Sequence, residues 1–272
     1  MSDQLESGCA APSIGATRLQ AVLWDMDGTL LESEQLWDIG MRELSLHLGG
    51  PMSEETRRAT IGGPLDLSVW RAFAGLGLEP TPDEQTAAED WLNAYMAGLF
   101  AQGLRWRPGA QAALDAVRAA GLGQVLVTNT GRRLCDVALE TLGRDRFDHT
   151  VCGDEVPAGK PDPAPYRRAA ELLGLDPAQC LAIEDSPTGA TSAEAAGCAV
   201  LVVPSLVEVP GSPRRVFRST LEGLTVADLR VARIGIALTW RFPRSCCSTR
   251  SRRCPTRRRS GCGSTPSRRR WG

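Results

Sequence analysis

The stretch Ala21-Val22-Leu23-Trp24-Asp25-Met26-Asp27-Gly28-Thr29 decides the fold of this chain of 272 residues. Its first four residues form an uninterrupted apolar run, which is typical of a strand buried on both faces of a parallel sheet. The polar residues and the glycine that follow predict a loop at the carboxyl end of this strand. The stretch therefore places two carboxylates, Asp25 and Asp27, where parallel sheets bind their ligands.

Three further apolar runs follow along the chain, at 124–128, 180–183 and 199–203. Helical patterns separate or flank these runs, at 109–120, 132–142, 163–173 and 188–196. Each pattern is followed by a glycine in the position of a helix C-terminal cap, namely Gly121, Gly143, Gly174 and Gly197. Strands that alternate with helices predict an α/β fold with a doubly wound, parallel, Rossmann-like sheet.

The segment after the first strand breaks this alternation, because residues 34–104 are helical in pattern throughout. We expect four helices there, at 34–48, 53–60, 66–75 and 82–101, which together predict an inserted all-helical cap domain. The core domain then consists of 19–33 and 105–230. Residues 1–18 are expected to be a flexible leader, and 231–272 an unstructured tail rich in arginine and cysteine.

The composition excludes several classes of function. No stretch approaches the roughly 20 apolar residues of a membrane span, and the N-terminus lacks the apolar run of a secretory signal. Eleven of the 31 basic residues lie in 241–272, which holds no acid, so the first 240 residues carry 20 basic residues against 32 acidic ones. An acidic body argues against a nucleic-acid partner. We therefore expect a cytoplasmic protein that binds neither nucleic acid nor membrane.

The tail has three interpretations. It could be a basic arm for nucleic acid or an acidic membrane surface, or a metal-binding cluster of its four cysteines. The interpretation we prefer is a frameshift product, because an arginine-rich code read out of frame gives this mixture of Arg, Ser, Cys, Pro and Gly. Resequencing the 3′ end of the gene tests this hypothesis, and an intact reading frame there would reject it.

The ends of the predicted strands bring acidic side chains together. Asp25 and Asp27 follow the first strand, and Glu184 and Asp185 follow the third. Two unit charges 4 Å apart repel by about 4 kcal/mol at an effective dielectric constant of about 20, so such a cluster needs cations. Magnesium suits hard oxygen ligands, and Lys160, the only lysine in the chain, is the natural second cation.

The spacing of Asp25 and Asp27 suits phosphoryl transfer. Residues i and i+2 of an extended chain point to one face, so both carboxylates can address one substrate. One can attack phosphorus and form an aspartyl-phosphate, while the other protonates the leaving oxygen and later deprotonates water. Gly28 permits close approach of the backbone to a phosphate, and Thr128 can donate a hydrogen bond to it.

Four motifs of the chain resemble, in the same order, those of the haloacid dehalogenase-like hydrolase superfamily: Asp25-Met26-Asp27-Gly28-Thr29, Thr128-Asn129, Lys160-Pro161 and Glu184-Asp185-Ser186. The helical insert is similar to the cap of the branch that includes beta-phosphoglucomutase and many sugar-phosphate phosphatases. The similarity spans about residues 19–230. Glu32 stands where relatives often have aspartate, which keeps the charge.

The resemblance implies a role for each charged residue. Asp25 would be the nucleophile and a magnesium ligand, and Asp27 the general acid and base, ligating magnesium through its carbonyl. Lys160 would stabilise the charge of the nucleophile and the phosphate. Asp185 would complete the metal site, with Glu184 bound directly or through water.

Other positions are candidates for binding the substrate or its phosphate. Gly28, Thr128 and Asn129 are expected on the phosphate side, although the hydroxyl and the amide could instead serve the fold. Arg58 and Gly62, in the segment 57–64, are expected to read the substrate from the cap, and the alternative there is an ordinary helix end with solvated arginines. The cap tryptophans at 37, 70 and 91 are expected in the cap core.

These residues predict a magnesium-dependent phosphatase that hydrolyses a small phosphomonoester, such as a sugar phosphate, through an aspartyl-phosphate. A phosphomutase of the beta-phosphoglucomutase type uses the same core and is the first alternative. A binding protein that acts through its basic tail and has no catalytic activity is the second. Asp27 favours phosphoryl transfer over dehalogenation, because the dehalogenases use neither a second aspartate of this kind nor magnesium.

Overall fold

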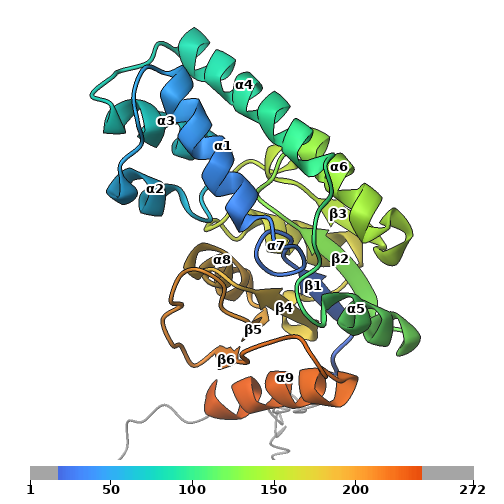
Figure 1. Cartoon of the computed structure of the whole chain (residues 1–272). Coiled ribbons are helices and arrows are strands. Elements are labelled where there is room, and N and C mark those ends of the chain that lie inside the picture. The colour runs from blue at the N-terminus through green and yellow to red at the C-terminus, as the bar shows by residue number, and fades with distance from the viewer. Residues whose placement is uncertain (1–17, 241–272) are drawn as a thin grey trace, which may run out of the picture. The chain divides into compact units, whose positions relative to one another are not determined.

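A computed structural model describes residues 18–240, the last seven of them as backbone only. Its central feature is a sheet of six parallel strands in the order β3-β2-β1-β4-β5-β6 (Figure 1). The strands are β1 (Ala21–Trp24), β2 (Gly123–Val127), β3 (His149–Val151), β4 (Cys180–Glu184), β5 (Ala199–Val202) and β6 (Arg215–Phe217). In this doubly wound order the direction of winding reverses between β1 and β4, and ligands bind at that point.

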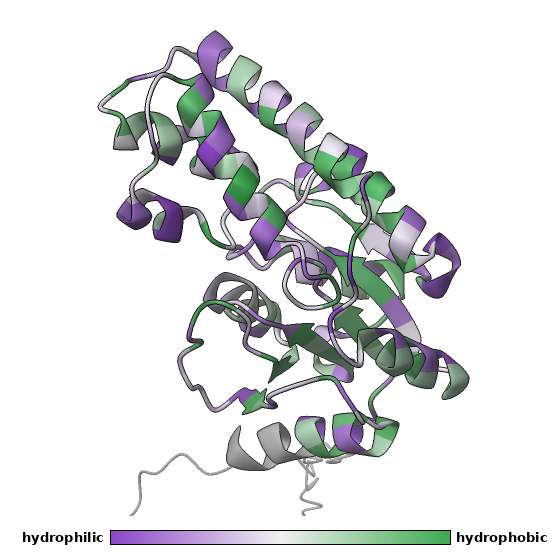
Figure 2. Ribbon diagram, viewed as in Figure 1, coloured by the Kyte–Doolittle hydropathy of each residue, from purple (hydrophilic) through white to green (hydrophobic). Residues whose placement is uncertain are grey.

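Helices cover both faces of the sheet, which explains why its four central strands are largely apolar (Figure 2). Alternate residues of β1 point to opposite faces, with Val22 and Trp24 on one and Ala21 and Leu23 on the other. The first face packs against α5 (Ala110–Ala119), α6 (Arg132–Leu142) and α9 (Val226–Trp240). The second packs against α7 (Ala164–Leu172) and α8 (Pro187–Ala196). The α/β fold expected from the sequence is therefore confirmed.

The four central strands and their helices lie where the sequence predicts them, and all four capping glycines have positive φ angles, between +66° and +107°. Two edge strands were missed. β3 and β6 have only three residues each and contain His149 or Arg215, so no apolar run marks them. Single 3-10 turns add η1 (Arg144–Arg146), η2 (Gly153–Glu155) and η3 (Pro177–Gln179).

The insertion between β1 and β2 is helical in every regular element, as the sequence predicts. It consists of α1 (Glu34–His47), α2 (Glu54–Thr60), α3 (Leu65–Gly75) and α4 (Pro82–Phe100), which lie together at the top of Figure 1. Local signals fix their starts. Ser53 accepts a hydrogen bond from the first turn of α2, and Thr81 forms a reciprocal capping box with Glu84 in α4. We call residues 34–100 the helical insertion.

The C-terminal end of the fold differs from the expectation. Helix α9 continues to Trp240, so the unstructured tail was placed ten residues too early. Ala232 and Arg233 are buried, and the Arg233 guanidinium donates to the Ala178 carbonyl, which gives the helix a partner that periodicity alone does not show. The remainder of the expected tail, 241–272, and the leader, 1–17, lie outside the described residues. Within the described residues, every helix is too short or too polar to cross a membrane.

Candidate active site

The site lies at the carboxyl ends of β1 and β4, where the winding of the sheet reverses. Asp25 immediately follows β1, and its amide donates to the Ile183 carbonyl of β4 at 3.0 Å, so the two strands stay paired up to the first carboxylate. Glu184 is the last residue of β4, and Asp185 follows it. Both elements therefore deliver their acids to one edge because the strands are parallel and in register.

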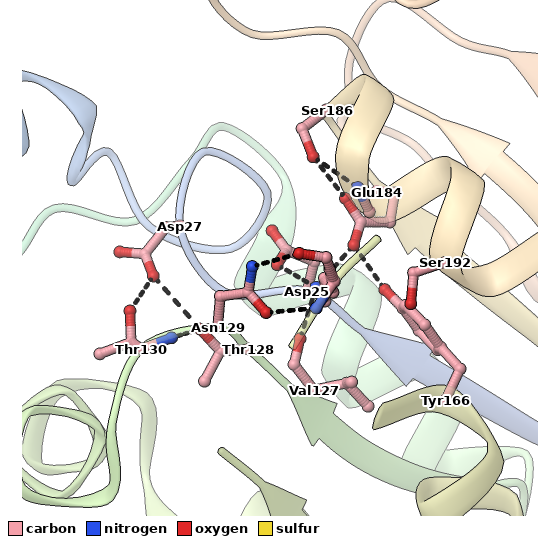
Figure 3. Close-up of polar contacts among 12 residues, drawn as sticks. Asp25, Asp27, Val127, Thr128, Asn129, Thr130, Tyr166, Glu184, Ser186 and Ser192 are labelled. Atoms are coloured by element: carbon pink, nitrogen blue, oxygen red, sulfur yellow. Dashed lines mark hydrogen bonds and ion pairs between the residues drawn. The ribbon is translucent and has the colours of Figure 1, made fainter. Parts of the chain in front are cut away.

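Lys160 is the cation at the centre of this edge, where it contacts Asp25, Val127 and Glu184, which Figure 3 labels. Its ammonium donates to Asp25 Oδ1 and to Glu184 Oε1, each at 2.6 Å, and to the Val127 carbonyl at 2.9 Å. Burial lowers the pKa of Lys160, but the Asp25 and Glu184 carboxylates outweigh it, and the pKa lies above its ordinary value. Lys160 therefore stays charged and fixes the two acids relative to each other.

Glu184 is completely buried, and its carboxylate accepts hydrogen bonds from three side chains. Oε1 accepts from the Tyr166 hydroxyl at 2.5 Å as well as from Lys160, and Oε2 accepts from Ser186 Oγ at 3.2 Å. Tyr166 was not among the residues predicted from the sequence. The only available signal was a tyrosine on the buried face of a helix, where a hydroxyl needs a partner. These contacts give Glu184 the task of holding Lys160.

Three carboxylates, those of Asp25, Glu184 and Asp185, bring one oxygen each within 4.8 Å of the others. Asp25 Oδ2 is buried and has no hydrogen-bond partner within the described chain. Gly28 has a φ of +80°, and a Cβ there would lie 2.1 Å from Asp185 Oδ2, so only glycine fits the loop against this carboxylate. An orphaned oxygen among hard oxygen donors fits a divalent cation.

The raised pKa values of Asp25 and Asp185 show that the site lacks positive charge. Burial, followed by the Glu184 charge, raises the pKa of Asp25 to about 8, although Lys160 opposes this shift. Burial and the Asp25 charge likewise raise the pKa of Asp185 well above its usual range. One ammonium cannot neutralise three buried carboxylates, so the site either retains protons or takes up a further cation.

Asp27 does not join this acidic cluster. Its Oδ1 accepts from Ser33 Oγ at 2.6 Å and from the Trp37 indole at 3.1 Å. Its Oδ2 accepts from Thr130 Oγ1 at 2.7 Å and from Thr128 Oγ1 at 3.3 Å. Because Trp37 belongs to the helical insertion and the threonines to the core, the orientation of Asp27 depends on both.

Of the predicted phosphate-side residues, Thr128 and Asn129 line the same cavity and Gly28 does not, and the polar groups of Thr128 and Asn129 are already engaged. Thr128 Oγ1 accepts from the Thr130 amide at 3.0 Å in addition to its contact with Asp27. The Asn129 side chain donates to the Lys160 carbonyl at 3.1 Å and accepts from the Lys160 amide at 2.7 Å. Asn129 therefore holds the backbone of the lysine loop, and Thr130, which the sequence analysis did not select, is the further polar residue here.

The helical insertion contributes a different arginine from the one expected. Arg57 is buried and lines the cavity, where it donates to Asp38 Oδ1 at 2.9 Å and to Thr60 Oγ1 at 3.1 Å. Arg58 is exposed and is not among the residues that line the cavity. Which of two successive helical residues points inward is set by the contact with Asp38, which the sequence does not reveal. Gly62 lines the cavity, and its contact with the substrate stays a prediction.

The three tryptophans of the helical insertion have three different environments. Trp37 lines the cavity and donates to Asp27, so its assignment to the core was incomplete. Trp70 is 52% exposed, which contradicts a core position. Trp91 stacks between His47 and Tyr95, with ring centroids at 4.5 and 5.2 Å, and packs against the core as expected.

Glu34, the first residue of α1, also lines the cavity, and the sequence analysis gave it no role. Burial raises the pKa of its carboxyl to about 7, the Asp27 charge adds to the shift, and Arg57 opposes it. The Glu34 carboxylate has no hydrogen bond or ion pair with another side chain or backbone group in the described part of the chain. A further carboxyl group with a raised pKa therefore faces the site from the helical insertion.

Comparison with known proteins agrees with this geometry. The family model of the haloacid dehalogenase-like hydrolases matches residues 19–197. The chain belongs to the haloacid dehalogenase-like hydrolase family, as its four motifs predicted. Phosphoglycolate phosphatase from Rhodospirillum rubrum is 35% identical over 190 residues, which cover 68% of this chain and 79% of that protein. Hexitol phosphatase B from Escherichia coli is 30% identical, with 78% and 97% covered. The chain is thus a hydrolase of phosphoric monoesters.

Solved structures share the whole architecture. CbbY from Rhodobacter sphaeroides, crystallised in complex with phosphate, is 26% identical and superposes with a TM-score of 0.70, covering 78% of this chain and 99% of that chain. Beta-phosphoglucomutase from Clostridium difficile has the same fold at 18% identity, with a TM-score of 0.72 and coverages of 81% and 99%.

Proposed function

We propose that the chain is a magnesium-dependent phosphatase that hydrolyses a sugar phosphate, or a similar small phosphomonoester, through an aspartyl-phosphate on Asp25. One observation carries this proposal. Asp25 has one oxygen bound by Lys160 and the other buried without a partner, and the residue lines a cavity between the sheet edge and the helical insertion. A nucleophile needs such an available oxygen, held in place by its other contacts.

Asp25 and Asp185 are the side chains that would hold Mg²⁺, together with the Asp27 carbonyl. Glu184 would support them from behind, because its oxygens already accept from Lys160, Tyr166 and Ser186. When bound, magnesium supplies positive charge that offsets the charge of the phosphoryl oxygens.

The protein residues then perform two displacements. In the first, the Asp25 carboxylate attacks phosphorus, the bond from phosphorus to the ester oxygen breaks, and Asp27 gives the leaving alcohol its proton. In the second, Asp27 takes a proton from water, the water oxygen attacks phosphorus, and the bond to Asp25 breaks to release phosphate. Lys160 orients the Asp25 carboxylate for the first attack and stabilises the negative charge that returns to it when the second displacement releases phosphate. Asp27 must give up part of its contacts with Ser33 and Trp37 to reach the leaving oxygen.

The residues that the helical insertion contributes to the cavity suit a neutral, hydroxyl-bearing leaving group. Glu34, Thr60 and Asn93 are among them and offer hydrogen-bonding groups. Among the described residues, Arg57 is the cation that the insertion contributes to the cavity lining, and it is already paired with Asp38. A second anion on the substrate, such as the carboxylate of phosphoglycolate, would meet Glu34 without a free cation, so we favour sugar and sugar-alcohol phosphates. The hexitol phosphatase among the relatives supports this choice.

A screen of phosphorylated metabolites for release of free phosphate, with and without Mg²⁺, tests the proposal. We expect release that requires the metal and is faster with hexose or hexitol phosphates than with phosphoglycolate. Conversion of one sugar phosphate into an isomer without phosphate release would instead identify a mutase. Inertness toward all esters offered would refute the proposal, and a preference for phosphoglycolate would refute the assignment of the leaving group.

A further inference from the structure

The Glu34 carboxylate reaches the edge of the acidic cluster from the helical insertion. A Cβ built on Gly28 would lie 2.1 Å from Asp185 Oδ2 and 3.4 Å from Glu34 Oε1. The two oxygens are therefore separated by no more than the sum of these distances, about 5.5 Å. Glu34 is not one of the three residues whose oxygens lie within 4.8 Å of one another. It stands just outside the set that could bind a metal directly.

A distance of no more than about 5.5 Å between the two oxygens is compatible with contact through one metal-bound water. Magnesium binds oxygen at about 2.1 Å in an octahedral arrangement and keeps several waters, so neighbouring ligand oxygens lie about 3 Å apart. A water next to Asp185 that donates to Glu34 at about 2.7 Å allows the two carboxylate oxygens to be up to about 5.7 Å apart. The bound on the distance between Asp185 and Glu34 falls within this reach.

Two further features point to an occupant at this place. Asp25 belongs to the same cluster, its Oδ2 is buried without a hydrogen-bond partner in the described chain, and its side chain is only 9% exposed. The Glu34 carboxylate has no recorded hydrogen bond within the described residues, although it is partly buried. Carboxylates that accept from metal-bound water commonly orient that water and strengthen metal binding.

We propose that Glu34 is a positioning residue of the metal site, which accepts a hydrogen bond from a water on the divalent cation and so ties helix α1 of the helical insertion to the core. This inference rests on the proposed function, because it requires a cation at Asp25 and Asp185. Glu34 begins α1 only seven residues after Asp27, so metal occupancy would fix the first turn of the helical insertion over the nucleophile.

Binding of Mn²⁺, measured from the electron paramagnetic resonance signal of the free ion, tests the inference without an activity assay. The variant Glu34→Gln keeps the size of the side chain and removes its charge. We expect Glu34→Gln to weaken Mn²⁺ binding about ten-fold, the lower end of the effect of losing an outer partner. Glu32→Gln makes the same charge change two residues earlier on an exposed side chain, and it should bind Mn²⁺ like the wild type.

Hydrogen exchange of the first turn of α1 gives a second measurement. Saturating Mg²⁺ should slow this exchange in the wild type and in Glu32→Gln but not in Glu34→Gln. Equal Mn²⁺ affinity in the wild type and Glu34→Gln would overturn the inference, and a raised KM with unchanged Mn²⁺ affinity would assign Glu34 to the substrate instead. If the wild type itself bound no Mn²⁺, the proposed magnesium dependence would fail as well. A thermal melt without metal checks that each variant folds.

Discussion

Replacement of Gly28 by alanine should lower the stability of the fold and the activity of the enzyme through two distinct effects. Two effects follow from the structure. The φ angle of +80° places an L side chain in the left-handed region, which costs about 1–2 kcal/mol of stability. The new Cβ would also lie 2.1 Å from Asp185 Oδ2, whereas such contacts need at least 3.0 Å, so the carboxylate must move by about 1 Å.

A misplacement of about 1 Å in an active-site group can cost about 100-fold in rate, so we expect the shift of the Asp185 carboxylate in Gly28→Ala to lower kcat/KM by about that factor. Urea denaturation and phosphate release measure the two effects. Gly121→Ala is the matched control, because Gly121 has a φ of +68° with no atom within 4 Å of the new Cβ. It should lose similar stability and keep full activity. A Gly28→Ala protein with more than half of the wild-type kcat/KM would refute the argument.

Two further predictions concern charge. Lys160→Met leaves the buried Asp25 and Glu184 carboxylates without their cation. We therefore expect the free energy of unfolding, measured in urea, to fall by about 3–5 kcal/mol. A loss below about 1 kcal/mol would contradict the assigned contacts. Asp25 and Glu34 have pKa values of about 8 and about 7 in the folded chain, against roughly 4 in the unfolded chain. The folded state therefore binds more protons than the unfolded state between these pH values. Its stability without metal should fall as the pH rises from about 4 to about 8. Magnesium should therefore raise the melting temperature more at pH 8 than at pH 6, and equal increases would show that no cation replaces these protons.

The sequence was sufficient for the central sheet because each strand there is a short apolar run between polar loops. Ala21–Trp24 and Cys180–Glu184 are buried on both faces, and their mostly apolar residues predict this burial. The edge strand Arg215–Phe217 carries no such signal, since its pairing with β5 is decided by tertiary contacts. The end of α9 was missed for the same reason, because Arg233 is buried by a partner 55 residues away.

The site was predictable where residues follow strands and unpredictable where they come from helices. Asp25 and Asp185 meet because parallel strands end at one edge. Arg57 rather than Arg58 faces the cavity because Asp38 of a different helix holds it. Similarly, the Trp37 indole turns to Asp27 instead of the core, a choice that depends on how α1 docks. Such orientations follow from packing between elements, which a single sequence does not specify.

Trapping of the aspartyl-phosphate is the most direct measurement of the central claim. The enzyme is mixed with its best substrate and Mg²⁺, quenched within one turnover, reduced with borohydride and digested with trypsin, which releases the peptide 19–42. Reduction converts a phosphorylated aspartate into homoserine, and we predict homoserine at position 25, with none in Asp25→Asn. A wild-type protein that turns over the substrate and never carries the modification at Asp25 would contradict the account.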